Sequence, residues 1–220
     1  MFEEALSPLQ RFSIWIIPVV LAITVHEVAH GWVAKRLGDP TAERLGRLTL
    51  NPIKHIDPIG TLLVPGVLMI VGGFIFGWAK PVPVTYENLR RPKRDMALVA
   101  IAGPGVNFIM AILWALVAKL ALSLPETAAW VKTPLMFMGV AGVSINIVLM
   151  VLNLIPLPPL DGGRVAVGLL PGPLGYRLSL LEPYGFFILL ALLITGLLGL
   201  LLGPPVELMQ RVVFFLVGGA

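Results

Sequence analysis

The sequence predicts an all-α polytopic membrane protein, organised as one membrane-embedded domain over residues 1–220. Composition is the first observation: 57% of the side chains are hydrophobic and 13% are charged, whereas soluble domains carry about 25% charged residues. The mean hydropathy of +0.92 agrees with this. The second observation is that several apolar stretches reach the roughly 20 residues that a helix needs to cross a bilayer. We therefore expect about four to six membrane segments, some of them broken helices, in the cell membrane.

Four stretches are expected to span the lipid bilayer, at residues 12–33, 96–122, 135–155 and 184–202. A fifth, 59–78, is long enough but contains Pro65 and several glycines, which membrane helices tolerate where they break around a site. The C-terminal piece 204–217 is expected to be a short helix at the membrane interface.

Lysine and arginine residues gather in two loops, 35–57 and 80–95, on either side of the fifth stretch. Cytoplasmic loops are enriched in these residues, so both loops are predicted to face the cytoplasm. The stretch 59–78 would then enter and leave on one side, as a re-entrant hairpin. Glu3 and Glu4 favour a non-cytoplasmic N-terminus. The net charge of +4 thus reports topology, and no nucleic-acid partner is expected.

The sharpest motif is His26-Glu27-Val28-Ala29-His30. Side chains four residues apart lie on one face of a helix, so His26 and His30 can bind one ion, with Glu27 beside them. This HExxH pattern is a zinc-hydrolase signature. The alternative is that the three side chains only pack in a buried helix, but ionisable groups inside a membrane are costly and indicate function by default. We therefore expect one Zn²⁺ per chain.

A zinc site of this kind needs a third protein ligand. The candidates are His55, Asp57 and Asp161, and we favour Asp161. It follows an apolar stretch broken by prolines, and the glycines at 162–163 allow a tight turn. The predicted topology also brings Asp161 and His30 to one depth. The alternative for Asp161 is a helix cap, and for His55 and Asp57 it is a solvated turn.

Three further motifs accompany HExxH. They are Asn153 upstream of the Leu-Asp-Gly-Gly sequence at 160–163, the Gly-Pro-Gly-Val-Asn sequence at 103–107, and the segment 51–60. Together they resemble the site-2 protease family of intramembrane zinc metalloproteases, in its compact prokaryotic branch without PDZ or CBS domains. The resemblance covers about 14–163. It implies zinc held by His26, His30 and Asp161, with Glu27 as the catalytic carboxylate.

The resemblance further implies cleavage of transmembrane protein substrates, with the active site towards the cytoplasmic side. Glu27 would accept a proton from zinc-activated water and pass it to the leaving amine. Asn153 is the candidate oxyanion donor; the alternative for Asn153, and equally for Asn107, is a hydrogen bond that joins two helices. Two pieces, 44–50 and 80–85, are predicted to be short β-like segments near the active site, able to pair with an unwound substrate.

Two other classes use the same residues. A metal or proton transporter also carries intramembrane His, Glu and Asp side chains, but the sequence has no repeated halves and no second cluster. A catalytically silent scaffold would be expected to lose Glu27 or a ligand, and this chain keeps all four groups. The sequence therefore favours regulated intramembrane proteolysis by a zinc metalloprotease.

Overall fold

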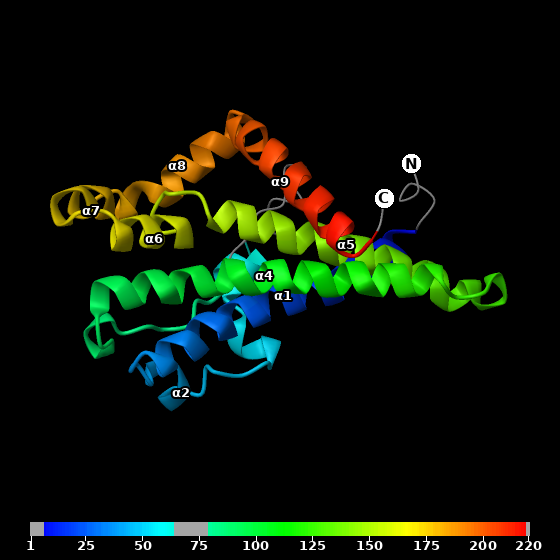
Figure 1. Cartoon of the computed structure of the whole chain (residues 1–220), viewed down its shortest axis with the longest axis horizontal. Helices are drawn as coiled ribbons and strands as arrows, with labels where there is room; N and C mark the ends of the chain where they lie inside the picture. Colours follow the sequence, from blue (N-terminus) through cyan, green and yellow to red (C-terminus); the bar gives the residue numbers. More distant parts are fainter. Residues whose placement is uncertain (1–6, 64–78, 219–220) are drawn as a thin grey trace.

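Four long helices dominate the computed structural model, which describes residues 7–63 and 79–218 (Figure 1). They are α1 (Pro8–Arg36), α4 (Pro92–Leu122), α5 (Ala129–Asn153) and α9 (Leu197–Leu216). All four are long and apolar enough to cross a membrane, and a bent pair of helices would count as a fifth span. The described residues contain no strand, so the all-helical membrane fold is confirmed.

Shorter elements connect these helices. In chain order they are α2 (Thr41–Arg44), η2 (Pro52–His55), η3 (Pro58–Leu63), η4 (Tyr86–Asn88), η5 (Glu126–Ala128), α6 (Asp161–Leu169), α7 (Gly172–Ser179) and α8 (Glu182–Ile194). The bent pair is α7 with α8, at an angle of 61°.

α1, α4 and α5 form the centre of the bundle and all contact one another. α1 and α5 run in one direction and α4 runs in the other (Figure 1). Small residues let α4 and α5 approach closely: a Cβ at Gly142 would lie 2.2 Å from the ring of Trp114. Close approach of this kind holds helices together in a membrane, where lipid is as apolar as the side chains. The bundle thus depends on residues with little or no side chain.

The C-terminal region differs from the expected single span at 184–202. α8 ends at Ile194, and Gly196 adopts a left-handed conformation (φ +75°) before α9 begins. The expected interfacial piece 204–217 instead continues α9, whose far end is fixed where Lys119 Nζ donates a 2.6 Å hydrogen bond to the carbonyl of Val217. The prediction failed because hydropathy does not register a break between two apolar helices.

The two predicted β-like pieces are wrong. Residues 41–44 form α2, and 45–50 continue without a strand. Residues 80–85 are irregular, although they are fixed at several points: the N–H of Val82 donates to Glu27, that of Thr85 donates to Asp39, and that of Arg90 donates to the carbonyl of Leu37. A strand needs a ladder partner, and this stretch bonds to α1 and the residues after it.

Asp39 organises the basic end of the bundle. Its carboxylate is fully buried and accepts hydrogen bonds from the N–H of Thr85 at 2.6 Å, from Nδ2 of Asn88 at 2.9 Å, and from the N–H and hydroxyl of Thr41. Although burial alone would raise the pKa of Asp39, these hydrogen bonds lower the pKa below its ordinary value. The ionised carboxylate therefore ties the 80–90 stretch to the end of α1.

The body of the predicted re-entrant hairpin, 64–78, lies outside the described residues. Its two flanks are described: the N–H of Lys80 donates to the carbonyl of His55 at 2.9 Å, and Arg47 Nη2 donates to the carbonyl of Lys80 at 2.9 Å. The described residues on the two sides of the predicted hairpin therefore lie next to each other.

Replacing Asp39 should destabilise the protein. Asp39→Ala removes the shared acceptor of several partly buried donors and should cost roughly 3 kcal/mol of unfolding free energy, since hydrogen bonds to charged groups are among the strongest. Because the folded pKa of Asp39 is depressed, its contribution is complete above about pH 4 and is lost as the pH falls through the lower folded value. Asp39→Asn, which removes the charge, tests this pH dependence. The difference in melting temperature between wild type and Asp39→Asn, measured in detergent, should narrow only in acid. Exposed Glu43→Gln serves as control, and a gap independent of pH would contradict this role.

Candidate metal centre

His26 and His30 lie one turn apart on α1 and point to one spot. Both are buried, at 8% and 9% exposure, and their Nε2 atoms are 3.0 Å apart. The helix itself supplies this convergence, since residues four apart stack on one face. The HExxH motif therefore forms the paired-imidazole site that its spacing predicts.

Asp161 supplies a third group from a different part of the chain. Its Oδ2 lies 3.2 Å from Nε2 of His26 and 3.2 Å from Nε2 of His30, and the carboxylate is buried. Leu160 occupies the N-cap position of α6 and Asp161 is the first helical residue, so the carboxylate does not act as a cap. Of the three ligand candidates, the structure brings Asp161 to the two histidines.

The protonation pattern of the cluster fits a metal ion. Nδ1 of His30 lies 2.7 Å from the carbonyl of Val99, which can only accept, so this ring carries its proton on Nδ1 and leaves Nε2 bare. Nδ1 of His26 faces Oδ1 of Asn107 at 2.5 Å. Oδ2 of Asp161 has no hydrogen-bond partner among the described residues. Two imidazole nitrogens and one carboxylate oxygen form a donor set that suits zinc and leaves a fourth position open.

Gly103 of α4 forms a wall of this cluster. A Cβ there would lie 2.5 Å from Cε1 of His26 and 2.5 Å from Nε2 of His30, closer than atoms can pack. Two residues on, a Cβ at Gly105 would meet open space. The imidazole rings therefore require glycine at position 103.

The turn before α6 depends on glycine for the same reason. A Cβ at Gly162 would lie 2.3 Å from the carbonyl oxygen of Leu154, and one at Gly163 would lie 2.1 Å from the nitrogen of Pro158. Gly185 of α8 packs on the other side of this turn, against the carbonyl of Pro158. Backbone contact on both sides fixes the residues just before Asp161.

Glu27 is half-buried and has one hydrogen bond. Its Oε2 accepts from the N–H of Val82 at 2.7 Å, while none of the described residues donates to Oε1. A backbone donor stabilises the ionised form of a carboxylate and restricts its rotation. Glu27 is therefore oriented by the 80–85 stretch, with one oxygen left free for chemistry.

The remaining candidates lie elsewhere or make structural bonds. Asn153 ends α5 and donates from Nδ2 to the carbonyl of Leu149 at 2.9 Å. Asp57 accepts from the N–H groups of residues 59 and 60, at 3.0 and 2.7 Å. His55 is buried, with Nε2 2.9 Å from the carbonyl of Thr49. Neither His55 nor Asp57 joins the metal cluster of the described residues.

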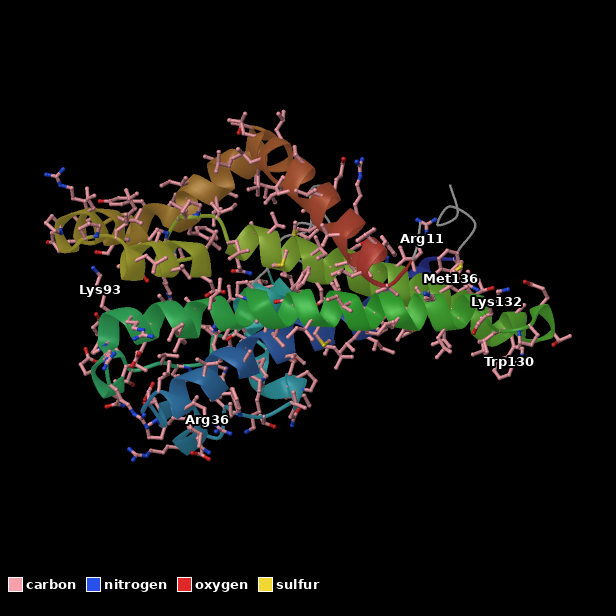
Figure 2. The ribbon with its side chains drawn as sticks, in the orientation of Figure 1. Arg11, Arg36, Lys93, Trp130, Lys132 and Met136 are labelled. Carbon is pink, nitrogen blue, oxygen red and sulfur yellow. The ribbon has the colours of Figure 1, made fainter. Side chains whose placement is uncertain are left out.

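A groove of about 410 Å³ lies between the stretch that bonds to Glu27 and α6, the helix that carries Asp161, although no cluster residue lines it. One wall is the 81–84 stretch, and the other includes Arg164 and Val167 of α6. Lys93 and Glu182 add charged groups to its lining. Lys93, which Figure 2 labels, also donates to the carbonyl of Leu170 and so connects α4 to the end of α6.

Sequence reasoning missed two residues that contact the site's side chains. Val82 orients Glu27, although its own side chain carries no signal because the backbone makes the bond. Asn146 is fully buried in α5 and bonds to Asn107 at 2.8 Å. An amide in the middle of an apolar helix was the signal for Asn146, since polar groups are expensive there.

Comparisons with known proteins agree with this site. The profile of peptidase family M50 matches residues 14–129. "Putative zinc metalloprotease YwhC" of Bacillus subtilis is 40% identical over 90% of this chain and 87% of its own length. "Putative zinc metalloprotease Rip2" of Mycolicibacterium smegmatis is 28% identical over 87% of this chain and 72% of its own length. No solved structure gives a significant match.

The contrast between the two glycines of α4 can be tested. Gly103→Ala should lower zinc affinity at least about 10-fold, because the added methyl displaces both imidazoles by more than a metal site tolerates. Gly105→Ala, which makes the same change in the same helix, should leave zinc affinity unchanged. Zinc affinity of the purified proteins, measured by chelator competition, checks both. Equal affinities of the two variants would mean that α4 does not press on the rings.

Proposed function

Because this chain belongs to peptidase family M50, the site-2 protease family of zinc metalloproteases, we propose that it hydrolyses peptide bonds in or beside transmembrane segments of other membrane proteins. One observation supports this most directly: Nε2 of His26, Nε2 of His30 and Oδ2 of Asp161 lie within 3.2 Å of one another in a buried position. Such a ligand set, carried by a membrane-length helix and the short helix α6, suits hydrolysis where ordinary proteases have no access.

His26, His30 and Asp161 are proposed to hold one zinc ion. Bound zinc supplies a Lewis acid that acidifies water and polarises the scissile carbonyl. The three residues come from α1 and from the first turn of α6, so the ion would also link two elements far apart in the sequence.

Glu27 is proposed as the general base and acid. Its free Oε1 would take the proton of the attacking water and then give it to the leaving amine, while Oε2 stays on the N–H of Val82. The backbone bond keeps the carboxylate in one orientation between these two proton transfers. Glu27 is not proposed as a zinc ligand. Its place next to His26, in the same turn of α1, suits it to act on the zinc-bound water instead.

Asn153 is proposed as the donor to the developing oxyanion. One N–H of its Nδ2 is used by the carbonyl of Leu149, and the second N–H on the same atom remains available. Asn153 ends α5 eight residues before Asp161, so it lies close in sequence to the metal cluster. Donors of this kind stabilise the charge that appears in the transition state.

The groove along 81–84 is proposed to receive the unwound part of a substrate. The carbonyls of Val82, Pro83 and Val84 have no hydrogen-bond partner among the described residues, so they can accept from the exposed N–H groups of an unwound helix. Val82 is at once part of this wall and the donor to Glu27. A peptide in the groove would thus lie beside the proposed base.

The proposed topology places the N-terminus outside and the active site towards the cytoplasm. Arg36 and Lys93, from the two basic loops and their borders, lie at one end of the molecule, and Arg11 and Trp130 lie at the other (Figure 2). The bond between His55 and Lys80 supports a hairpin that enters and leaves on the basic side. Positively charged loops favour the cytoplasmic side.

The transporter hypothesis gains no support from the described residues. They contain one group of potential metal ligands, and the transport path would need further polar groups along it. The two functions differ in whether a peptide bond is broken.

Glu27→Gln tests the proposed chemistry. It should abolish cleavage of a transmembrane-segment reporter reconstituted in liposomes, because the amide cannot take a proton, and it should retain zinc. Loss of a general base typically costs about 100- to 10,000-fold in rate. Glu43→Gln, a matched change at an exposed carboxylate, should cleave normally. Undiminished cleavage by Glu27→Gln would exclude Glu27 as the base.

Asp161→Ala tests the ligand set. Removing one of three protein ligands should lower the zinc content of the purified protein to near background. Asp57→Ala, which removes a carboxylate outside the metal cluster of the described residues, should retain one zinc per chain. Elemental analysis of both variants measures this directly, and full zinc content in Asp161→Ala would move the third ligand elsewhere.

A further inference from the structure

Two asparagines are completely buried where α1, α4 and α5 meet. Asn107 of α4 and Asn146 of α5 both have 0% exposure in an otherwise apolar bundle. Buried amides are costly unless their hydrogen bonds are made. Here the bonds run in series: Asn146 donates to the carbonyl of Gly142 at 2.8 Å, Asn107 donates to Asn146 Oδ1 at 2.8 Å, and Asn107 Oδ1 lies 2.5 Å from Nδ1 of His26.

The direction of this series is set at its far end. The carbonyl of Gly142 can only accept, so the amide nitrogen of Asn146 must face it and its oxygen must face Asn107. Asn107 then turns its own nitrogen to Asn146 and its oxygen to His26. An amide oxygen facing Nδ1 accepts a hydrogen bond from an Nδ1–H, so the neutral ring keeps its proton on Nδ1 and has a bare Nε2 directed at Asp161.

We propose that Asn146, acting through Asn107, is a positioning residue that selects the metal-binding tautomer of His26. For His30 a single hydrogen bond, from Nδ1 to the carbonyl of Val99, selects the same tautomer. For His26 two amides transmit the direction across the bundle from the carbonyl of Gly142 on α5, and Nδ2 of Asn107 also faces the carbonyl of Ala22 on α1 at a longer distance of 3.5 Å. This inference rests on the metal site proposed above.

The competing explanation is that the two asparagines only hold three helices together. Each explanation predicts a loss of stability when an asparagine is removed, so stability cannot separate them. They differ in zinc affinity and in the position of one proton. They also differ in how the effects of the two substitutions on zinc affinity combine. Residues in a series act as one unit, whereas separate helix contacts act independently.

Zinc affinity of the full-length protein in detergent gives the first test. Asn107→Leu should raise the Kd for zinc about 10- to 100-fold, the usual effect of losing a partner of a metal-bound histidine. Asn146→Leu should raise it in the same direction, and the double variant should be no worse than Asn107→Leu. Ile147→Ala, a cavity in the buried residue next to Asn146, should lower the melting temperature and leave the Kd unchanged.

Independent, multiplying effects of the two asparagine changes on the Kd would overturn the proposal, as would a Kd in Ile147→Ala that rises as much as in Asn146→Leu. If Asn107→Leu does not fold, Asn146→Leu against Ile147→Ala decides alone. Wild-type protein that binds no zinc would instead refute the metal site itself, so the two failures are distinguishable.

The position of the proton gives a second readout that needs neither zinc nor activity. The chain has three histidines, so selective ¹⁵N labelling of histidine yields three pairs of ring signals. In zinc-free wild type, at a pH where the rings are neutral, His26 should be in the Nδ1–H form. Asn146→Leu should shift His26 towards a tautomer mixture and leave His30 unchanged. A His26 ring that is identical in both proteins would overturn the proposal.

Discussion

Two imidazole rings and a carboxylate face one another inside a largely apolar bundle, and much of the surrounding structure serves to hold these three groups together. Without a cation, three lone pairs within 3.2 Å would repel in a medium that screens charge poorly. A bound cation would remove this repulsion, and fixed partners behind the two rings would keep them directed at it. Val99 and Asn107 of α4 are those partners for the two rings. α4 is thus as necessary to the site as the helix that carries the histidines.

Backbone proximity is the second requirement, and it explains why glycine recurs around the site. Gly103 lets α4 lie on the imidazoles, and Gly162 lets α6 start against the end of α5. A membrane bundle gains little from burying apolar side chains, because lipid offers the same environment. Close contact between backbones, with hydrogen bonds across them, is what remains to hold a ligand set in place.

The sequence predicts the parts of the site that are local. His26 and His30 are one helical turn apart, and Asp161 is marked by its prolines and glycines. The link from Asn107 to Asn146 spans 39 residues and the link from Glu27 to Val82 spans 55, so neither leaves a local pattern. The β-like pieces were predicted from alternation at 44–50 and from β-branched residues between prolines at 80–85, and both patterns describe side chains and not the partner that a strand needs. The break at Gly196 was missed because apolar residues lie on both sides of it.

The Val82 bond connects substrate binding to the proposed base. Two carboxylates hold the stretch that lines the groove. Glu27 accepts a hydrogen bond from the N–H of Val82 at one end, and Asp39 accepts one from the N–H of Thr85 at the other. Asp39 is fully buried and makes only structural bonds, so its end of the stretch is fixed. Glu27 divides its two oxygens, one for this wall and one for proton transfer. A peptide that presses on the wall would therefore act on the orientation of the carboxylate proposed to cleave it, so that the proposed groove and base would work as one unit.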